Sequence, residues 1–416
     1  MHWPKLTSDK IKKRIIEALT KNVNYRKTPI LGVPATYLDP EVFYDDAPFL
    51  NNAPFLSTLI ANPNHIGCHT LGGDTEKLFK GTQEIEKELI KLCAEQIFYG
   101  NPDAQDGYIA SGGTEANIEA LWIYRNFFIK QYNAQPNEIA LIYSEDSHYS
   151  LAKGSNILNI NSIKISVEPT NRILNLLELE KKTELAKANG IKHFIVNMNL
   201  STTMFGSVDD IDKVTMLLNR KNINYKLHVD AAFGGFIYPF SNPENSYTFK
   251  NPYITSFTID AHKMLQTPYG TGIFLIRKGY MQYVRTTEAQ YVAGTDHTLC
   301  GSRSGANAIA VWMVLHNYGS EGWKTKMQTL VDKTTDICYQ LDEIGIRYFR
   351  NPYLNIIAIH ASGISGSVAS KYFLVADSYE HEPQWWKIVV MPHITRGSID
   401  SFISDLKSEI KIKQRN

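Results

Sequence analysis

The sequence has little excess charge, and it has no long apolar run. Its 416 residues include 43 lysines and arginines against 42 aspartates and glutamates, which gives a net charge of +1. Such a chain has no overall field that would attract nucleic acid or an anionic membrane. No apolar run approaches the roughly 20 residues of a membrane-spanning helix, and the first residues lack the apolar core of a secretory signal. These absences predict a soluble globular protein.

Cysteine is also scarce. The spacing of the cysteines is untypical of a disulfide or zinc framework, because they lie far apart and form no Cys-x-x-Cys pair. We therefore expect reduced thiols in a cytoplasmic protein. The four cysteines are Cys68, Cys93, Cys300 and Cys338.

Common binding motifs are missing as well. The chain lacks a P-loop with its lysine, the three-glycine dinucleotide fingerprint and the HExxH pattern of zinc enzymes. His148, His228, Asp230 and His262 could in principle hold a metal together, but no two of them have the spacing of a known zinc motif. We expect no metal site.

The first part of the chain, residues 1–66, combines one helix with an irregular, proline-rich stretch. Thr7 or Ser8 precedes residues 9–21, where apolar side chains recur at helical spacing. Residues 27–66 hold many prolines and many apolar side chains, which such a segment cannot bury by itself. We expect this stretch to wrap a second copy of the chain, so the sequence predicts a homodimer.

The second part, residues 67–300, is predicted to be the large domain. Strand and helix patterns alternate between residues 107 and 276. This alternation predicts an α/β fold with a mainly parallel central sheet and helices on both faces. The third part, residues 301–416, is predicted to be a small α+β domain that begins with separate helices over residues 306–316 and 324–341.

Five polar or glycine-rich segments follow predicted strands of the large domain. Ligands of open α/β sheets bind at the carboxyl ends of the strands, so these segments should meet in space. The segments are SGGTEAN (111–117), SHYS (147–150), STTMFG (201–206), HVDAAFGG (228–235) and IDAHKM (259–264).

The first three segments each allow a binding role and a plainer one. The glycines at 112 and 113 let the backbone approach a ligand, and Thr114 would cap a helix whose free amides favour a phosphate. A simple Gly-Gly turn with a threonine cap gives the same pattern. His148 could stack on a flat ring or occupy an ordinary capping position. The hydroxyls of residues 201–206 could reach a ligand oxygen or belong to an ordinary loop, and Asp209 and Asp210 are predicted to cap the helix that follows.

The last two segments place an aspartate and a lysine at the ends of buried strands. Asp230 requires a cation or hydrogen-bond donors, and a pyridinium N–H supplies both. Lys263 follows a core strand, where an unpaired lysine is costly. Together with the glycine turn, they predict a Schiff base between Lys263 and pyridoxal 5′-phosphate. A metal-ligating Asp230 and a surface Lys263 are the alternatives.

These motifs, together with GSRSG (301–305), resemble those of the group II pyridoxal-phosphate-dependent amino-acid decarboxylases. The resemblance covers about residues 60–400 and implies the fold type I, or aspartate aminotransferase-like, architecture. Residues 142–153 and 296–305 are most similar to bacterial histidine decarboxylases and plant serine decarboxylases. Residues 390–396 resemble archaeal tyrosine/aspartate decarboxylases more weakly. One departure is Ser201, where family members usually have glycine.

The resemblance implies how the cofactor is held. The phosphate would be bound by Gly113, Thr114 and His262, and the phosphate of the partner subunit would be reached by Ser302. The ring would be contacted by His148 and Ala232 on its faces, by Asp230 at its nitrogen and by Thr202 at its hydroxyl, with Lys263 as the covalent link.

The resemblance also implies the reaction, which is decarboxylation of an L-amino acid to its amine and CO₂. Lys263, His148 and Tyr291 are the predicted catalytic residues, with Tyr291 acting from a loop at the dimer interface to return a proton to Cα. His69 and Arg396 are candidate substrate residues, and a histidine-, aromatic- or acidic-type substrate is expected.

Two alternatives to this reaction stay open. An aldehyde synthase or a carbon–carbon lyase would use the same residues, because fold and cofactor do not fix the reaction. A catalytically silent, partner-binding relative is the alternative that is not an enzyme.

Overall fold

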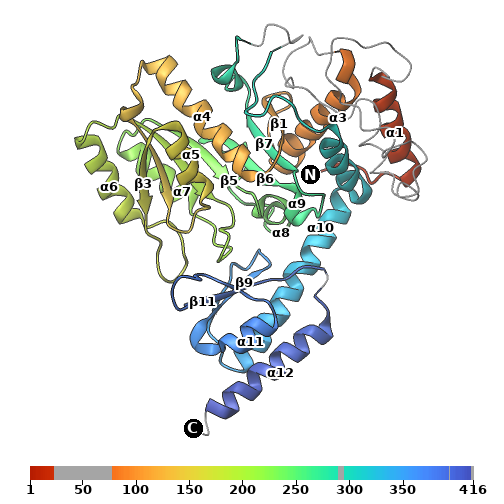
Figure 1. Cartoon of the computed structure of the whole chain (residues 1–416), viewed down its shortest axis with the longest axis vertical. Coiled ribbons are helices and arrows are strands. Elements are labelled where there is room, and N and C mark those ends of the chain that lie inside the picture. The colour runs from red at the N-terminus through yellow and green to blue at the C-terminus, as the bar shows by residue number, and fades with distance from the viewer. Residues whose placement is uncertain (23–76, 289–294, 393, 414–416) are drawn as a thin grey trace.

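A computed structural model describes residues 1–22, 77–288, 295–392 and 394–413. The expectations for residues 27–66, His69 and Tyr291 therefore lie outside the described residues. A larger part is built around a sheet, and a smaller part lies below it and carries the carboxyl end of the chain (Figure 1).

The sheet of the larger part has seven strands in the order β1-β7-β6-β5-β4-β2-β3. They are β1 (Gln105–Ala110), β2 (Ile139–Ser144), β3 (Asn161–Ile165), β4 (His193–Asn199), β5 (Tyr225–Asp230), β6 (Ile254–Asp260) and β7 (Gly272–Arg277). Of these strands, β7 alone runs antiparallel to its neighbours, β1 and β6. The other pairs, from β6 to β3, are parallel. The carboxyl ends of β1, β2, β4, β5 and β6 therefore lie at one edge of the sheet.

Helices cover both faces of this sheet, as the alternating pattern predicts. Neighbouring side chains of a strand point to opposite faces. Tyr108 packs in one apolar cluster with side chains of α4 (Gly113–Tyr132) and α5 (Ser150–Leu158). Ile109 packs in the other cluster. The helices of this second cluster include α1 (Ser8–Lys21), α3 (Lys80–Lys91), α6 (Leu176–Ala188) and α7 (Ile211–Arg220).

The predicted first helix is confirmed, with Thr7 as its cap: the Thr7 hydroxyl accepts a hydrogen bond from the Lys10 amide at 3.4 Å. The helix α3 buries one face that includes Ile85 and Leu89, and a π-helical turn, η3 (Leu92–Ile97), extends it. The other short elements of the larger part are η2 (Lys77–Phe79), η4 (Pro136–Glu138), η5 (Gly234–Phe236), α8 (Tyr238–Ser241), α9 (Ala261–Met264) and η6 (Met281–Val284).

One long element, α10 (Gly305–Glu343), stands where the sequence predicts two separate helices. The two helices meet directly at Gly319, whose φ of 66° and ψ of 176° are not helical. A Cβ at this glycine would lie 2.5 Å from the backbone nitrogen of Lys5, so the close approach of the amino-terminal segment requires glycine here. The first part of α10 packs on α3 and α8, and its last part packs against the smaller part of the molecule.

The smaller part contains a four-stranded sheet in the order β10-β11-β9-β8, and every pair is antiparallel. One apolar cluster joins this sheet to its helices. The elements are β8 (Tyr348–Phe349), β9 (Ile356–His360), η7 (Ala361–Gly363), α11 (Gly366–Lys371), β10 (Val375–Ala376), β11 (Trp385–Val389) and α12 (Arg396–Lys413).

Two further observations concern the described residues only. None of their helices combines the length and the apolar character that crossing a bilayer requires. Three of the cysteines are described as free thiols, with Cys93 and Cys338 buried and Cys300 exposed.

Candidate active site

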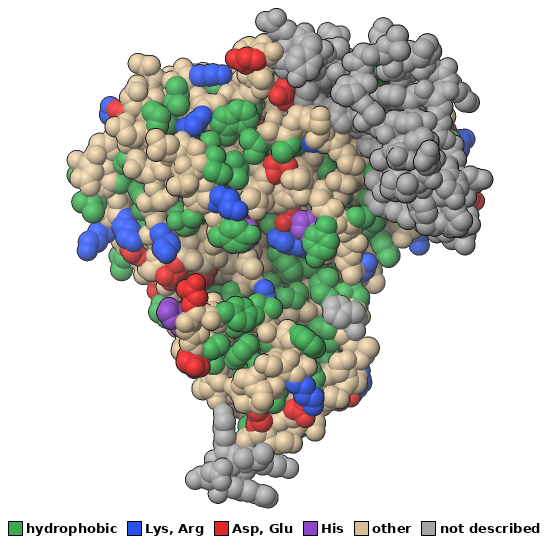
Figure 2. Space-filling view, in the orientation of Figure 1, with side chains coloured by type: hydrophobic (Ala, Val, Ile, Leu, Met, Phe, Trp, Pro, Cys, Tyr) green, Lys and Arg blue, Asp and Glu red, His purple; other side chains and the backbone are tan. Residues whose placement is uncertain are grey.

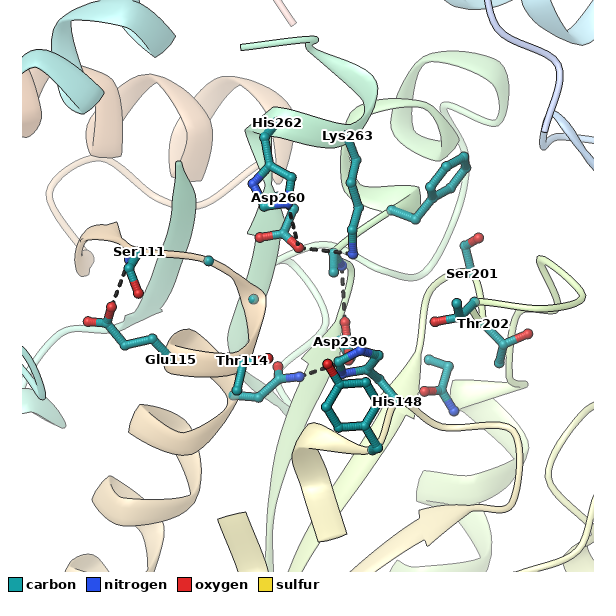
Figure 3. A pocket seen from close by; sticks show the side chains of 18 residues that line it. Ser111, Thr114, Glu115, His148, Ser201, Thr202, Asp230, Asp260, His262 and Lys263 are labelled. Carbon is teal, nitrogen blue, oxygen red and sulfur yellow. Dashed lines mark hydrogen bonds and ion pairs between the residues drawn. The ribbon is translucent and has the colours of Figure 1, made fainter. Parts of the chain in front are cut away.

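A cavity of about 320 Å³ opens at the edge of the sheet where the parallel strands end. All five segments singled out in the sequence contribute to its wall, so their predicted convergence is observed (Figure 3). Acidic, basic and histidine side chains gather near the middle of the face shown in Figure 2, bordered by hydrophobic ones. The cavity is lined by Ser111, Gly112, Gly113, Thr114, Glu115, Asn117, His148, Tyr149, Asn199, Ser201, Thr202, Thr203, Asp230, Ala232, Phe233, Asp260, His262 and Lys263.

Lys263 projects into the cavity from α9, the single helical turn that follows β6. Its Nζ lies 2.9 Å from Oδ2 of Asp260, a buried carboxylate at the end of β6. His262 Nε2 lies 3.7 Å from the same oxygen, and burial lowers the pKa of the His262 imidazole, which favours its neutral form. No role for Asp260 was predicted from the sequence. A carboxylate three residues before the lysine was the available signal.

Asp230 is buried at the end of β5, and both of its oxygens accept hydrogen bonds. Oδ1 accepts from the amide of Ala232 at 3.1 Å, and Oδ2 accepts from Nδ2 of Asn117 at 2.9 Å. Asn117 lies one turn into α4 and is itself buried. Its contact with Asp230 was not anticipated from the sequence.

His148 is partly buried at the wall of the cavity, and burial lowers the pKa of its imidazole. Its Nδ1 lies 2.9 Å from the hydroxyl of Ser150 and accepts a 3.3 Å hydrogen bond from the Ser150 amide. The ring of Tyr149 lies 4.1 Å from the His148 ring, centroid to centroid. A neutral imidazole therefore borders the space where a planar ligand would lie.

The glycine turn before α4 brings backbone close to the lysine segment. A Cβ on Gly113 would lie 2.8 Å from Oδ2 of Asp260, so a side chain here would have to displace the Asp260 carboxylate. The prediction that Thr114 caps the helix was wrong. α4 begins at Gly113, and Gly112 is in the cap position without a side-chain hydrogen bond. The first amides of α4 still face the cavity edge and still suit an anion.

In the loop after β4, the Thr202 hydroxyl is hydrogen-bonded within the loop. Thr202 Oγ1 accepts a hydrogen bond from the Ser207 amide at 3.1 Å and contacts the Ser207 hydroxyl at 2.7 Å. Ser201 adopts φ = 83°, the left-handed region that favours glycine. The backbone of this loop therefore has the shape that glycine would give, although the residue is serine.

The prediction that Asp209 helps to cap α7 was also wrong. The cap is Asp210, which accepts from the Lys213 amide at 3.0 Å. The buried Asp209 carboxylate instead accepts from the amide and the side chain of Asn199 and from the Leu174 amide. Burial raises the pKa of Asp209 to about 6. This carboxylate fixes Asn199, which lines the cavity.

The residues of the cavity fit pyridoxal 5′-phosphate. Amides at the start of α4 suit a phosphate, Asp230 suits a protonated ring nitrogen, and Lys263 can bond covalently to an aldehyde. Three polar atoms of lining residues are buried without a hydrogen-bond partner, namely Asp260 Oδ1, His262 Nδ1 and Ser201 Oγ. Buried polar atoms are rarely left unpaired, so their concentration here is consistent with a site built for a polar ligand.

Two predicted site residues lie elsewhere in the described structure. Ser302 is exposed just before α10, and Arg396 is exposed at the first residue of α12. Neither is among the described residues that line the cavity. Among the described residues, no group of three or more His, Cys, Asp or Glu side chains is suited to hold a metal ion.

Comparison with known families and curated proteins identifies related chains. The family described as "Pyridoxal-dependent decarboxylase conserved domain" matches residues 82–344. The tryptophan decarboxylase of Clostridium sporogenes is 46% identical over 405 residues, 97% of each chain. A probable L-tyrosine/L-aspartate decarboxylase of Methanocella arvoryzae is 32% identical over 366 residues, 85% of this chain and 92% of that protein. The histidine decarboxylase of Vibrio campbellii is 29% identical over 339 residues, 78% of this chain and 79% of that protein.

Solved structures with the same fold include two amino-acid decarboxylases. L-methionine decarboxylase from Streptomyces sp. 590 aligns with a TM-score of 0.71 at 17% identity, over 96% of this chain and 93% of that one. Glutamate decarboxylase from Lactobacillus brevis aligns with a TM-score of 0.68 at 17% identity, over 99% and 94%. The predicted fold class is confirmed.

Proposed function

The chain belongs to the pyridoxal-dependent decarboxylase family, and from that membership we propose that its substrate is an aromatic L-amino acid, with tryptophan the first candidate. The enzyme is a lyase that uses pyridoxal 5′-phosphate to convert an L-amino acid to its amine and CO₂. The observation that carries the substrate proposal is the 46% identity to a tryptophan decarboxylase along 97% of both chains.

The wall of the cavity supports an aromatic substrate. Tyr149 and Phe233 line the same cavity as Lys263. Flat apolar faces of this kind pack well against another aromatic ring. The weaker identity to histidine and tyrosine/aspartate decarboxylases makes a histidine- or acidic-type substrate the alternative.

The residues of the cavity have distinct proposed roles in holding the cofactor. Gly113, Thr114 and His262 bind its phosphate, Thr202 lies near its ring hydroxyl, and Lys263 bonds to it. Asp230 holds a proton at the ring nitrogen, and His148 and Ala232 contact the two ring faces. When bound, pyridoxal phosphate supplies the electron sink for the breaking bond between Cα and the carboxylate.

The remaining work of the protein is orientation and proton placement. His148 and Lys263 both line the cavity in which the substrate's Cα would lie. Tyr291 is proposed to return a proton to Cα. Tyr291→Phe should then divert product from amine to aldehyde, and an unchanged amine yield would remove Tyr291 from the mechanism. His69 and Arg396 stay predictions as substrate residues.

We also propose that the enzyme is a cytoplasmic homodimer whose subunits share their active sites. The exposed position of Ser302 suits a contact with the partner subunit's cofactor. The separated cysteines suit a reducing compartment. We keep the division of the chain into residues 1–66, 67–300 and 301–416. The helix α10 contributes side chains to the apolar clusters of both the larger and the smaller part. Sedimentation at micromolar concentration should show a dimer, and a monomer at that concentration would refute this part of the proposal.

The substrate is tested with a panel of the twenty L-amino acids, each assayed for CO₂, amine and aldehyde. The proposal expects tryptophan to be turned over with the highest kcat/KM and tyrosine or phenylalanine to follow. Preference for histidine or aspartate would overturn the substrate class. Aldehyde as the main product would indicate an aldehyde synthase, and cleavage without CO₂ would indicate a carbon–carbon lyase.

A further inference from the structure

A chain of buried hydrogen bonds runs from the interior of the large domain to the cavity. The Tyr124 hydroxyl contacts the Ser256 hydroxyl, which lies 2.6 Å from His228 Nδ1. His228 Nε2 lies 3.0 Å from Asn117 Oδ1, and Asn117 Nδ2 lies 2.9 Å from Asp230 Oδ2. Each of these side chains is at most 6% exposed, so water does not compete for the contacts. The chain ends on the carboxylate proposed to face the ring nitrogen.

Asn117 is the branch point of this chain. Its Nδ2 also lies 2.9 Å from the hydroxyl of Ser150, which in turn lies 2.9 Å from His148 Nδ1. The two hydrogens of one amide group therefore serve Asp230 and, through Ser150, His148. The two side chains follow different strands, and from α4 Asn117 contacts Asp230 directly and His148 through Ser150.

The charge on Asp230 fixes the orientation of the Asn117 amide. Its nitrogen must face the carboxylate, because the opposite orientation would set two oxygens 2.9 Å apart. Asn117 Oδ1 then faces His228, so His228 must carry its proton on Nε2. Burial lowers the pKa of His228 to about 4, which keeps the ring neutral and its Nδ1 free to accept from Ser256.

The hydrogen bonds of Ser150 determine in the same way which ring nitrogen of His148 carries the proton. The Ser150 hydroxyl accepts from Asn117, so its own hydrogen is available for His148 Nδ1. The Ser150 amide also donates to that nitrogen. His148 Nδ1 is therefore an acceptor, and the proton of the neutral imidazole is on Nε2.

We propose that Asn117 is a positioning residue for the decarboxylation: its amide fixes the Asp230 carboxylate and, through Ser150, the Nε2–H tautomer of His148. The inference rests on the proposed function, in which Asp230 serves the ring nitrogen and His148 serves the ring face. Asn117 couples these two sites through one rigid group, so a change at this residue disturbs both together.

The first experiment uses histidine ¹⁵N NMR on the protein without cofactor, which makes it independent of the reaction and of the substrate. Both His148 and His228 should show the neutral Nε2–H tautomer, with assignments from His148→Gln and His228→Gln. Asn117→Leu should give mixed tautomers at His148. A wild-type His148 in the Nδ1–H form would overturn the proposal.

The second experiment compares turnover in Asn117→Leu with that in Asn126→Leu. Asn126 lies on the same helix and donates to the Tyr283 carbonyl at 3.0 Å, outside the described cavity wall, so it is the matched control. Asn117→Leu should lower kcat about ten- to a hundredfold with a smaller change in KM, as loss of a residue that orients reacting groups does. It should also shift the pH dependence of the visible absorption of bound cofactor.

A structural role alone would lower the yield of folded protein but leave kcat per bound cofactor and the absorption titration unchanged, and that result would contradict the proposal.

Ser150→Ala provides a second variant if Asn117→Leu does not fold. It removes the 2.9 Å hydroxyl contact with His148, leaves the longer 3.3 Å contact from the Ser150 amide, and keeps the Asn117–Asp230 bond. It should therefore disturb the His148 tautomer but not the absorption titration. An undisturbed His148 tautomer in Ser150→Ala would equally refute the coupling. If the NMR result holds while the amino-acid panel fails, the proposed substrate is wrong and the coupling stands.

Discussion

The two sheets of this enzyme differ in what they place at their strand ends. In the large sheet, six strands end at the same edge, and residues at or after the ends of five of them form the cavity wall. In the small sheet every described pair is antiparallel, so successive strands end on opposite edges. A parallel arrangement gathers side chains from distant parts of the sequence, and an antiparallel arrangement separates them.

The two parts also contain ion pairs that differ in how deeply their side chains are buried. Against the large sheet, Glu86 of α3 forms a buried ion pair with Arg303, which lies just before α10, and the two side chains are 0% and 5% exposed. The small part keeps comparable groups in water, as in the ion pair between Lys371 and Asp405, which are 61% and 31% exposed. Substitutions in the first set should therefore have much larger effects than substitutions in the second.

The largest contrast is expected between two lysines. Lys263→Ala removes the covalent link and a proton-carrying group and should lower kcat/KM by about 10²–10⁴-fold. Lys371→Ala, the control in the small part, should leave kcat/KM unchanged. Steady-state rates of CO₂ release measure both. Comparable losses of kcat/KM in the two variants would contradict the expected difference between the two parts.

The next contrast concerns stability. Arg303→Met leaves the Glu86 carboxylate buried without its counter-charge and should lower the free energy of unfolding by about 3–5 kcal/mol. The Ile109 amide donates to Glu86 at 2.7 Å, so adding Glu86→Gln keeps an acceptor and should recover part of the loss. Lys371→Met should not measurably change the urea midpoint. Equal midpoints for Arg303→Met and wild type would contradict the expectation.

A pH effect is expected from His228. Its folded pKa is about 4, below the 6.5 of the free side chain, so the unfolded chain binds more protons between these values. This contribution is present above pH 6.5, is lost as pH falls toward 4, and amounts to about 3 kcal/mol. Urea titrations from pH 4 to 7 should show a shallower fall in His228→Gln. His381→Gln, at an exposed histidine of the small part, should keep the wild-type slope. A wild-type slope in His228→Gln would refute this assignment.

The smallest effect is expected at Ser201. Ser201→Gly relieves a left-handed backbone conformation, but glycine adds freedom to the unfolded chain. The net gain in unfolding free energy should be below about 1 kcal/mol. Thermal unfolding without cofactor measures it, with Ser201→Ala as the control that retains the conformation. A lower melting temperature for the glycine variant than for the alanine variant would show that the backbone is not strained here.

Much of this architecture was predictable because its signals are local. Alternating strands and helices predicted the large sheet, and the residues after each strand predicted the cavity, including Lys263, Asp230 and His148. The antiparallel β7 was not predicted, because a strand pattern carries no direction. The helix caps were misplaced by one or two residues at Thr114 and Asp209, because neighbouring polar residues offer equivalent local signals.

The partners of the catalytic groups were not predictable in the same way. Asn117 and Asp230 are separated by 113 positions, and an asparagine inside a helix gives no sign of a distant partner. Asp260 lies within the recognised DAHK segment, but its 2.9 Å contact with Lys263 depends on the turn of α9. Long-range pairing of buried polar groups therefore requires the structure.

The central claim is that Lys263 is the residue bonded to pyridoxal phosphate. Borohydride reduction of the holoenzyme, followed by proteolysis and mass spectrometry, tests it directly. We expect a single phosphopyridoxyl group on the peptide that contains Lys263. Modification of another lysine, such as Lys387, or no modification of a protein that releases CO₂ from an amino acid, would contradict it.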